Sequence, residues 1–190
     1  MGYTIFVITL VAEILSAIAV MVSILFPQRR IWPPSQQHAW AGYVMWCLFI
    51  ISGVGAVAVG IIDWGTMDLA PWVRWILGAP LWLAGNIFAL WAITVLGLAE
   101  SFGDEGTLVR RGPYRFSRNP QYVGFIAGLI GWALVASSTQ ALVVSLVGTI
   151  PLMLVPFAEE PWLLARYGAS YEAYKHSVPR FISFRSWNSS

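Results

Sequence analysis

The sequence predicts an all-α, polytopic membrane protein with about five transmembrane helices, followed by helices that lie along the cytosolic surface of the membrane. Three observations support this fold class. Of the 190 residues, 58% are hydrophobic and only 11% are charged, and the mean hydropathy is +0.69. These values are too apolar for an ordinary soluble domain. Five apolar stretches approach the roughly 20 residues that a helix needs to cross a bilayer. Basic residues, finally, collect on one side of these stretches.

The five stretches cover residues 3–26, 40–62, 72–98, 122–136 and 140–157. No basic segment precedes the first stretch and Glu13 lies inside it, so we expect a span of the mature protein rather than a secretion signal. The last two are short, and only residues 137–139 separate them, which predicts a tight helical hairpin.

The distribution of the 11 Lys and Arg residues supports a count of five spans. One side of the membrane then carries only Arg74, together with Asp63 and Asp68. The other side carries Arg29, Arg30, Arg110, Arg111, Arg115, Arg118, Arg166, Lys175, Arg180 and Arg185. Because basic loops stay on the cytosolic side, we expect the amino terminus outside and the carboxyl terminus in the cytosol. Anionic membrane lipids are the expected partners of the basic loops.

Other classes of site have little support in the sequence. A single cysteine, Cys47, and two histidines, His38 and His176, do not favour a zinc or iron site, so we expect no metal. Basic residues are not interleaved with aromatic ones as in a nucleic-acid-binding surface, so we expect no nucleic-acid partner. The sequence gives no indication of an oligomeric state.

Glycines inside the spans are interpreted as packing positions. Gly124 and Gly128 are four residues apart in the fourth span, and Gly53, Gly55 and Gly60 cluster in the second. Inside apolar helices we expect such glycines to allow close approach of a neighbouring helix rather than to bind a nucleotide.

A polar loop at residues 100–121 follows the third span. Gly112-Pro113 marks a turn, and Pro120 favours an extended Asn119 followed by the first turn of the fourth span. The backbone amides at that helix start, with Arg118 beside them, would suit an anionic group such as a carboxylate.

A second polar segment, residues 159–181, follows the fifth span. Its Leu163, Tyr167, Tyr171 and Tyr174 recur at helical spacing, which predicts interfacial helices. The adjacent Glu159 and Glu160 point about 100° apart on a helix, so we expect them to have different partners. One would bind Arg118 and the other a ligand. The alternative is a pair of solvated carboxylates that simply ends the span.

These two segments contain the motifs Arg-x-Gly-Pro-Tyr-x-x-x-Arg-Asn-Pro-x-Tyr-x-Gly (110–124) and Glu-Glu-x-x-Leu-x-x-x-Tyr-Gly-x-x-Tyr-x-x-Tyr-x-x-x-Val-Pro-Arg-Phe (159–181). In this order, with two spans between them, they resemble the carboxyl-terminal half of the isoprenylcysteine carboxyl methyltransferase family, over roughly residues 96–181. Phospholipid N-methyltransferases are similar too. The resemblance implies a methyltransferase that binds S-adenosylmethionine at the cytosolic boundary of the membrane.

Carried over to this chain, the resemblance implies a cofactor site closed by Glu159 and Glu160 and lined by Leu108, Val109, Gly112, Tyr114, Arg118, Asn119, Pro120 and Tyr122. Arg118 would hold the methionine carboxylate and a glutamate the ammonium or the ribose hydroxyls. Arg118, Glu159 and Glu160 are therefore also the catalytic candidates. The chain departs from the family in having Asn119 where a histidine is frequent, and Gly106 or Thr107 where a further histidine stands.

Methyl transfer from a sulfonium mainly requires proximity and alignment. If the acceptor is protonated, Glu159, Glu160, Tyr171 and His176 are the candidate bases. Glu13 and Asn86 lie at membrane depth, where polar groups are frequently functional. Two interpretations of Glu13 are open: it binds a cationic head group or Asn86, or it is a protonated carboxyl satisfied by a neighbouring helix. The substrate candidates are thus Glu13, Asn86, Tyr171 and His176.

The chain is read as a single membrane domain, residues 1–190, in which residues 1–99 form the acceptor side and residues 100–190 the cofactor side. The acceptor is a lipid-like or hydrophobic molecule with a carboxylate, amine or thiol. Two alternatives remain: an NADPH-dependent membrane reductase of the sterol-reductase type, and a non-catalytic membrane subunit that binds lipid.

Overall fold

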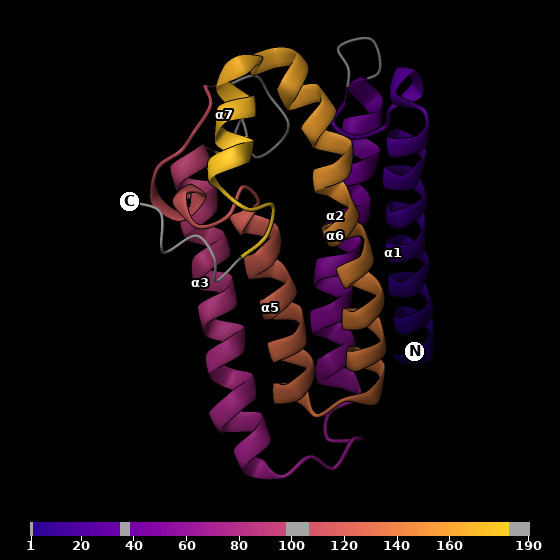
Figure 1. The fold of residues 1–190 in the computed structure, drawn as a ribbon. Coiled ribbons are helices and arrows are strands. Elements are labelled where there is room, and N and C mark those ends of the chain that lie inside the picture. The colour runs from indigo at the N-terminus through magenta and orange to yellow at the C-terminus, as the bar shows by residue number, and fades with distance from the viewer. Residues whose placement is uncertain (1, 35–38, 98–106, 183–190) are drawn as a thin grey trace.

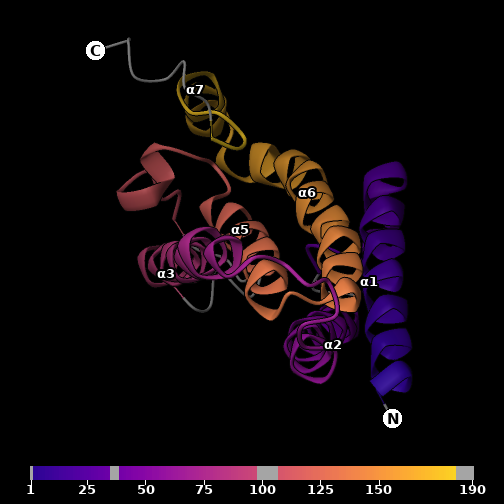
Figure 2. The same cartoon turned by 90° about the horizontal axis from the view of Figure 1, so that it is seen from below.

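The computed structural model describes residues 2–34, 39–97 and 107–182, in which all regular secondary structure is helical. Five long helices lie side by side: α1 (Gly2–Leu25), α2 (Ala39–Ile62), α3 (Ala79–Leu96), α5 (Pro120–Ala136) and α6 (Thr139–Tyr167). A π-helical segment, η3 (Val73–Gly78), leads directly into α3. In the view along the bundle, α5 lies between α3 and α6 (Figure 2). This arrangement confirms the predicted all-α fold.

Four helices are long and apolar enough to cross a membrane: α1, Trp40–Ile62 of α2, the η3–α3 unit Val73–Leu96, and α6. The fifth, α5, has 17 residues and is therefore roughly 25 Å long, a little less than a bilayer core. It contacts α2, α3 and α6. Large apolar side chains such as Ile8, Ile18 and Ile87 are more than half exposed on the bundle surface, where lipid would cover them. The fold agrees with the prediction of about five spans.

The fifth helix continues beyond the residue at which the predicted span ends. We expected the span to end at residue 157 and surface helices to begin at Glu159, but α6 continues unbroken to Tyr167. Pro151, Pro156 and Pro161 lie within it, because neighbouring helices compensate for the missing hydrogen bonds of prolines in membrane helices. Gly168, with φ 50°, ends α6, and α7 (Ala169–Ser177) is the only separate helix after it among the described residues. Figure 1 shows α6 curving over into α7.

The predicted hairpin between α5 and α6 is present and tighter than expected, since only Ser137 and Ser138 lie between the helices. Ser138 Oγ caps α6 by accepting from Ala141 N–H at 2.9 Å. Asp63, which follows α2, accepts hydrogen bonds from Ser138 Oγ at 2.6 Å and Gln140 N–H at 3.0 Å. A carboxylate from another loop therefore stabilises the amino terminus of α6.

Glycines bring α3 and α5 into close contact, as expected for the Gly124 and Gly128 pair. A Cβ on Gly124 would lie 2.6 Å from Gly85 O, and one on Gly131 would overlap the backbone of Trp82. In α2, Cβ atoms on Gly55 and Gly60 would overlap Thr9 and Trp132. Gly53 is an exception to the prediction, because nothing lies within 4 Å of its ideal Cβ.

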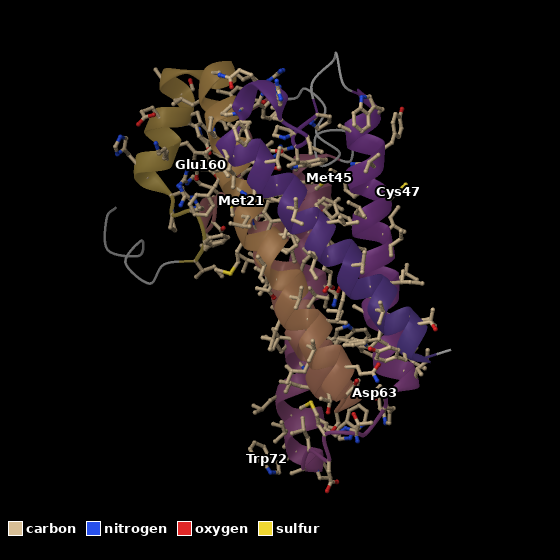
Figure 3. All side chains as sticks on the ribbon, turned by 90° about the vertical axis from the view of Figure 1, so that its right-hand side faces the viewer. Met21, Met45, Cys47, Asp63, Trp72 and Glu160 are labelled. Atoms are coloured by element: carbon tan, nitrogen blue, oxygen red, sulfur yellow. The ribbon has the colours of Figure 1, made fainter. Side chains whose placement is uncertain are left out.

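The polar segments gather at one end of the bundle. Residues 26–34, residues 107–119, the carboxyl end of α6 and α7 lie together at the top of Figure 1, and the α5–α6 turn lies at the bottom. Figure 3 shows Glu160 near one end of the molecule and Asp63 and Trp72 near the other. The first end contains the candidate site.

Candidate functional site

A cavity of about 120 Å³ lies at the polar end, where residues 107–119, the start of α5, the end of α6 and α7 meet. Seven of the ten residues expected to bind a cofactor line it: Leu108, Val109, Tyr114, Arg118, Asn119, Tyr122 and Glu159. The structure therefore brings together side chains from both sequence motifs, although α5 and most of α6 separate them in sequence.

Three expected lining residues do not reach this cavity. Gly112 has φ 59° and forms the turn into the 3-10 helix η4 (Gly112–Arg115), a conformation that favours glycine. Pro120 is buried at the first position of α5. Glu160 points instead to two arginines. These three residues shape the site rather than line it.

Glu160 is held by an ion-pair cluster. Arg180 donates to it through two atoms, Nε to Oε1 and Nη2 to Oε2, both at 2.7 Å. Arg118 Nη1 lies 2.9 Å from Glu160 Oε1. The hydrogen bond to Glu160 raises the pKa of Arg180. The structure agrees with the expectation that the adjacent glutamates have different partners, since Glu160 is the one that forms an ion pair with Arg118.

The end of the second motif is tied directly to the first by the backbone. Arg118 N–H donates to Pro179 O at 2.9 Å. Ser117 Oγ and Asn119 Nδ2 both donate to Arg180 O, at 3.1 and 3.0 Å. One N–H of the Asn119 amide is thus engaged by the chain itself.

Glu159 faces the cavity and is fixed from two sides. Trp32 Nε1 donates to Glu159 Oε1 at 2.8 Å, and Tyr122 Oη donates to the same oxygen at 2.7 Å. Among the described residues both hydrogen bonds reach Oε1, which leaves Oε2 for a ligand. Burial without an arginine partner makes this carboxylate chemically distinct from Glu160.

Arg118 has an unused donor. Its side chain is only 7% exposed, and its Nε is buried without a hydrogen-bond partner. Buried donors are nearly always satisfied in folded proteins, so an orphaned guanidinium N–H on a residue that lines a cavity favours an anionic ligand there.

Tyrosines form much of the remaining wall. Tyr174 Oη donates to Tyr114 O at 2.7 Å, and Gln121 Nε2 donates to Tyr114 Oη at 3.1 Å. Burial raises the pKa of Tyr171 to about 12, with a further contribution from Glu160. Burial also raises the pKa of Tyr114 and Tyr174. Tyr171 is therefore protonated at neutral pH, which argues against its expected role as a base.

His176 does not belong to the site. Its side chain is 78% exposed and lies 3.4 Å from Glu172 on the surface of α7. It does not line the cavity, because it projects from the side of α7 opposite to the buried Tyr171 and Tyr174. The prediction of His176 as a substrate or base residue is not supported.

Glu13 and Asn86 line a second cavity of about 430 Å³ inside the bundle. They are not hydrogen-bonded to each other among the described residues, contrary to one expectation. Asn86 Nδ2 donates to Trp82 O at 2.7 Å instead, as polar side chains in helices frequently do.

Sequence reasoning missed several residues of the first cavity, among them Trp32, Pro33, Gln121, Trp162, Tyr167 and Tyr174. Trp162 and Tyr167 lie within the second motif and on the same helix as Glu159, so their spacing was an available signal. Trp32 is remote in sequence, and only its position before two prolines distinguishes it. No group of three or more His, Cys, Asp or Glu side chains gathers as a metal site within the described residues.

Comparisons with known proteins identify the family of the chain. The model of the phospholipid methyltransferase family matches residues 73–170. The steroid 5-alpha-reductase DET2 of Solanum lycopersicum is 27% identical over 111 residues, which cover 58% of this chain and 43% of that protein. The chain thus spans less than half the length of this curated relative. No solved structure matches the chain significantly. Arg118, Tyr122 and Glu159 lie inside the family match, whereas Trp32 and Arg180 lie outside it.

Proposed function

The chain belongs to the phospholipid methyltransferase family, and we propose that it is an integral membrane methyltransferase that uses S-adenosylmethionine to methylate a lipid-like or hydrophobic acceptor. One observation carries this proposal. Arg118, whose buried Nε has no hydrogen-bond partner, and Glu159 both line one cavity at the polar end of the bundle.

The residues of the cavity fit the amino-acid part of this cofactor. Arg118 would hold the carboxylate through its free N–H, and Glu159 Oε2 would hold the ammonium group. The aromatic rings of Tyr114 and Tyr122 would stabilise the positively charged sulfonium. A volume of about 120 Å³ is below the roughly 300–1,000 Å³ of typical small-molecule sites. The nucleoside would therefore extend beyond it, toward the half-buried Leu108 and Val109.

In the reaction, the bound cofactor supplies an electrophilic methyl group. The chain's own residues orient the reactants, which is the larger part of catalysis for an in-line displacement. An acceptor that is already a carboxylate, a thiolate or a free amine needs no base, so Glu159 would act by holding the cofactor's ammonium group through Oε2. Glu160 is neutralised by Arg118 and Arg180, Tyr171 is protonated, and His176 is remote. Trp32 and Tyr122 would keep Glu159 in position through Oε1.

We assign the polar end of the bundle to the cytosol and the amino terminus to the outside. Arg29, Arg110 and Arg166 belong to the segments gathered at the polar end, while Asp63 and Arg74 belong to the other end. The positive-inside rule favours this orientation. A soluble cofactor would then enter from the cytosol and a hydrophobic acceptor from the bilayer.

A reductase that binds NADPH is the second candidate, because of the similarity to the tomato steroid 5-alpha-reductase. It predicts the opposite cofactor preference in the same cavity. A non-catalytic lipid-binding subunit predicts affinity for neither cofactor.

Calorimetry with the detergent-purified protein tests the proposal. We expect S-adenosylhomocysteine to bind, and Arg118→Ala and Glu159→Gln to weaken binding at least tenfold. Arg115→Ala is a matched control, since Arg115 is exposed on η4. Binding of NADPH alone would replace the proposal with the reductase. Binding of neither compound to folded protein would leave the non-catalytic role.

A further inference from the structure

We propose that the cavity of about 430 Å³ inside the bundle is the acceptor site, and that Glu13 and Ser52 select an apolar molecule carrying a hydroxyl group deep in the membrane. That the bound molecule accepts the methyl group rests on the function proposed above. The binding site itself does not depend on it.

The cavity has the size and lining of a small-molecule site. All five long helices contribute to it, and its wall is mostly apolar, with side chains such as Phe49, Phe125 and Trp132. Its volume falls within the roughly 300–1,000 Å³ that such sites occupy. An apolar body entering from the bilayer would therefore be well accommodated.

Two buried polar atoms on this wall have no hydrogen-bond partner. They are Glu13 Oε2 and Ser52 Oγ, and the Glu13 residue is only 1% exposed. Leaving such groups unpaired costs about 1–3 kcal/mol each. A hydroxyl on a bound molecule would satisfy either atom, because it both donates and accepts.

The neighbouring helix leaves room for the Glu13 carboxyl. Gly148 lines the same cavity, and a Cβ there would lie 2.7 Å from Glu13 Oε1. Ser16, one turn along α1, shows the contrast: its Oγ donates to Ala12 O at 2.8 Å and is satisfied within the helix. Glu13 thus projects into the cavity while Ser16 does not need a partner there.

The two cavities share a wall. Trp32, Gln121 and Tyr122 line both of them. A molecule in the inner cavity therefore reaches the side chains that hold Glu159, which is where methyl transfer is proposed. The inner cavity is therefore adjacent to the candidate cofactor site.

Glu13 lies deep in the bundle. Leu129 and Glu13 both lie beside Gly148: a Cβ on Gly148 would be 3.6 Å from Leu129 Cδ1 and 2.7 Å from Glu13 Oε1. Tyr122 and Leu129 are seven residues apart on α5, or roughly 10 Å at 1.5 Å per residue. The Glu13 carboxyl therefore lies about two helical turns deeper in the bundle than the start of α5 at Tyr122.

Fluorescence titration of the purified protein tests the proposal with decanol and decyl methyl ether as probes. Trp46, Trp82 and Trp132 line the cavity, so binding changes the intrinsic tryptophan emission. The ether keeps the oxygen of decanol but lacks the donor. The ratio of the two dissociation constants largely cancels partitioning into detergent when variants are compared.

We expect the wild-type protein to prefer decanol by at least about threefold. Glu13→Leu and Ser52→Ala should reduce this preference toward one, and Ser16→Ala should leave it unchanged. If Glu13→Leu does not fold, Ser52→Ala still decides the result. A preference that is absent in the wild type, or unchanged in both variants, would overturn the proposal and leave cavity water as the partner of these atoms.

The two proposals fail separately. A Glu13-dependent preference for decanol without binding of S-adenosylhomocysteine would keep the hydroxyl site and remove the methyltransferase. Binding of S-adenosylhomocysteine without that preference would do the reverse.

Discussion

Trp32 and Glu159 are hydrogen-bonded at 2.8 Å across 127 residues of sequence. The indole N–H comes from the segment between α1 and α2, and the carboxylate comes from α6. The Trp32 ring also packs edge-on against Trp46 and Phe49 of α2. The amino-terminal half of the chain therefore positions the carboxylate that we propose to hold the ammonium group of the cofactor.

Trp32→Phe should weaken S-adenosylhomocysteine binding about three- to tenfold. The substitution retains an aromatic ring but removes the donor to Glu159, and an intramolecular hydrogen bond typically contributes about 0.5–1.5 kcal/mol. Calorimetry measures the change. Trp40→Phe is the control, because Trp40 is 63% exposed on α2. Equal affinities of the Trp32 and Trp40 variants would show that Glu159 is positioned without the indole.

Glu160→Gln should mainly reduce the stability of the fold, whereas Glu159→Gln should mainly weaken cofactor binding. Glu160→Gln removes the partner of Arg118 and Arg180, which should destabilise the fold by about 1–3 kcal/mol. Glu159→Gln keeps an acceptor for Trp32 and Tyr122, so the fold should persist while cofactor binding weakens at least tenfold. Thermal unfolding and calorimetry on both variants measure these effects. Similar melting temperatures for the two would contradict the structural role of Glu160.

Arg180→Lys should weaken the contact between the chain end and the polar loop. A lysine cannot reproduce the two parallel hydrogen bonds that Arg180 makes to Glu160. We expect a loss of about 1 kcal/mol in stability, since the Arg180 side chain is partly exposed. Arg115→Lys, on an exposed residue of η4, should have no effect in the same unfolding assay. An unchanged Arg180 variant would mean that its backbone carbonyl alone holds the segment.

Gly131→Ala should destabilise the protein by about 3 kcal/mol, because the new methyl group would overlap the Trp82 backbone and force α3 and α5 apart. Gly53→Ala is the matched control within a helix and should be nearly neutral, since nothing lies within 4 Å of its ideal Cβ. Unfolding in detergent by denaturant measures both. Comparable losses would indicate a general effect of replacing helix glycines rather than close packing.

Asp63→Asn should reduce stability at neutral pH and have no effect in acid. Partial burial opposes the shift, yet hydrogen bonds from Ser138, Gln140 and Thr66 hold the pKa of Asp63 below its ordinary value of 3.8. A carboxyl with a lowered folded-state pKa stabilises the fold above its unfolded pKa and loses this contribution as the pH falls through the folded pKa. Melting temperatures of both proteins should therefore converge as the pH falls below the lowered pKa of Asp63. A difference that persists there would assign the effect to the amide rather than to the charge.

The hydropathy and charge of this sequence were enough to predict its helices, their number and the end at which polar residues gather. These properties are local, because each span must satisfy its own backbone and bury its own apolar side chains in lipid. The end of α6 was missed because the adjacent glutamates and Pro161 resemble a membrane boundary, whereas Arg118 and Arg180 stabilise Glu160 within the continuing helix.

Sequence by itself also determined which motif residues were candidates for the site, and most of them line one cavity. Only the tertiary structure decided their individual surroundings: Glu160 is bound by arginines, Glu159 by Trp32 and Tyr122, and Asn119 by the Arg180 carbonyl. It also decided that Glu13 and Asn86 both line the inner cavity, and that Asn86 donates to Trp82 O rather than to Glu13. The physical reason is that partners distant in sequence meet only when the helices pack, and no local pattern specifies which donor meets which acceptor.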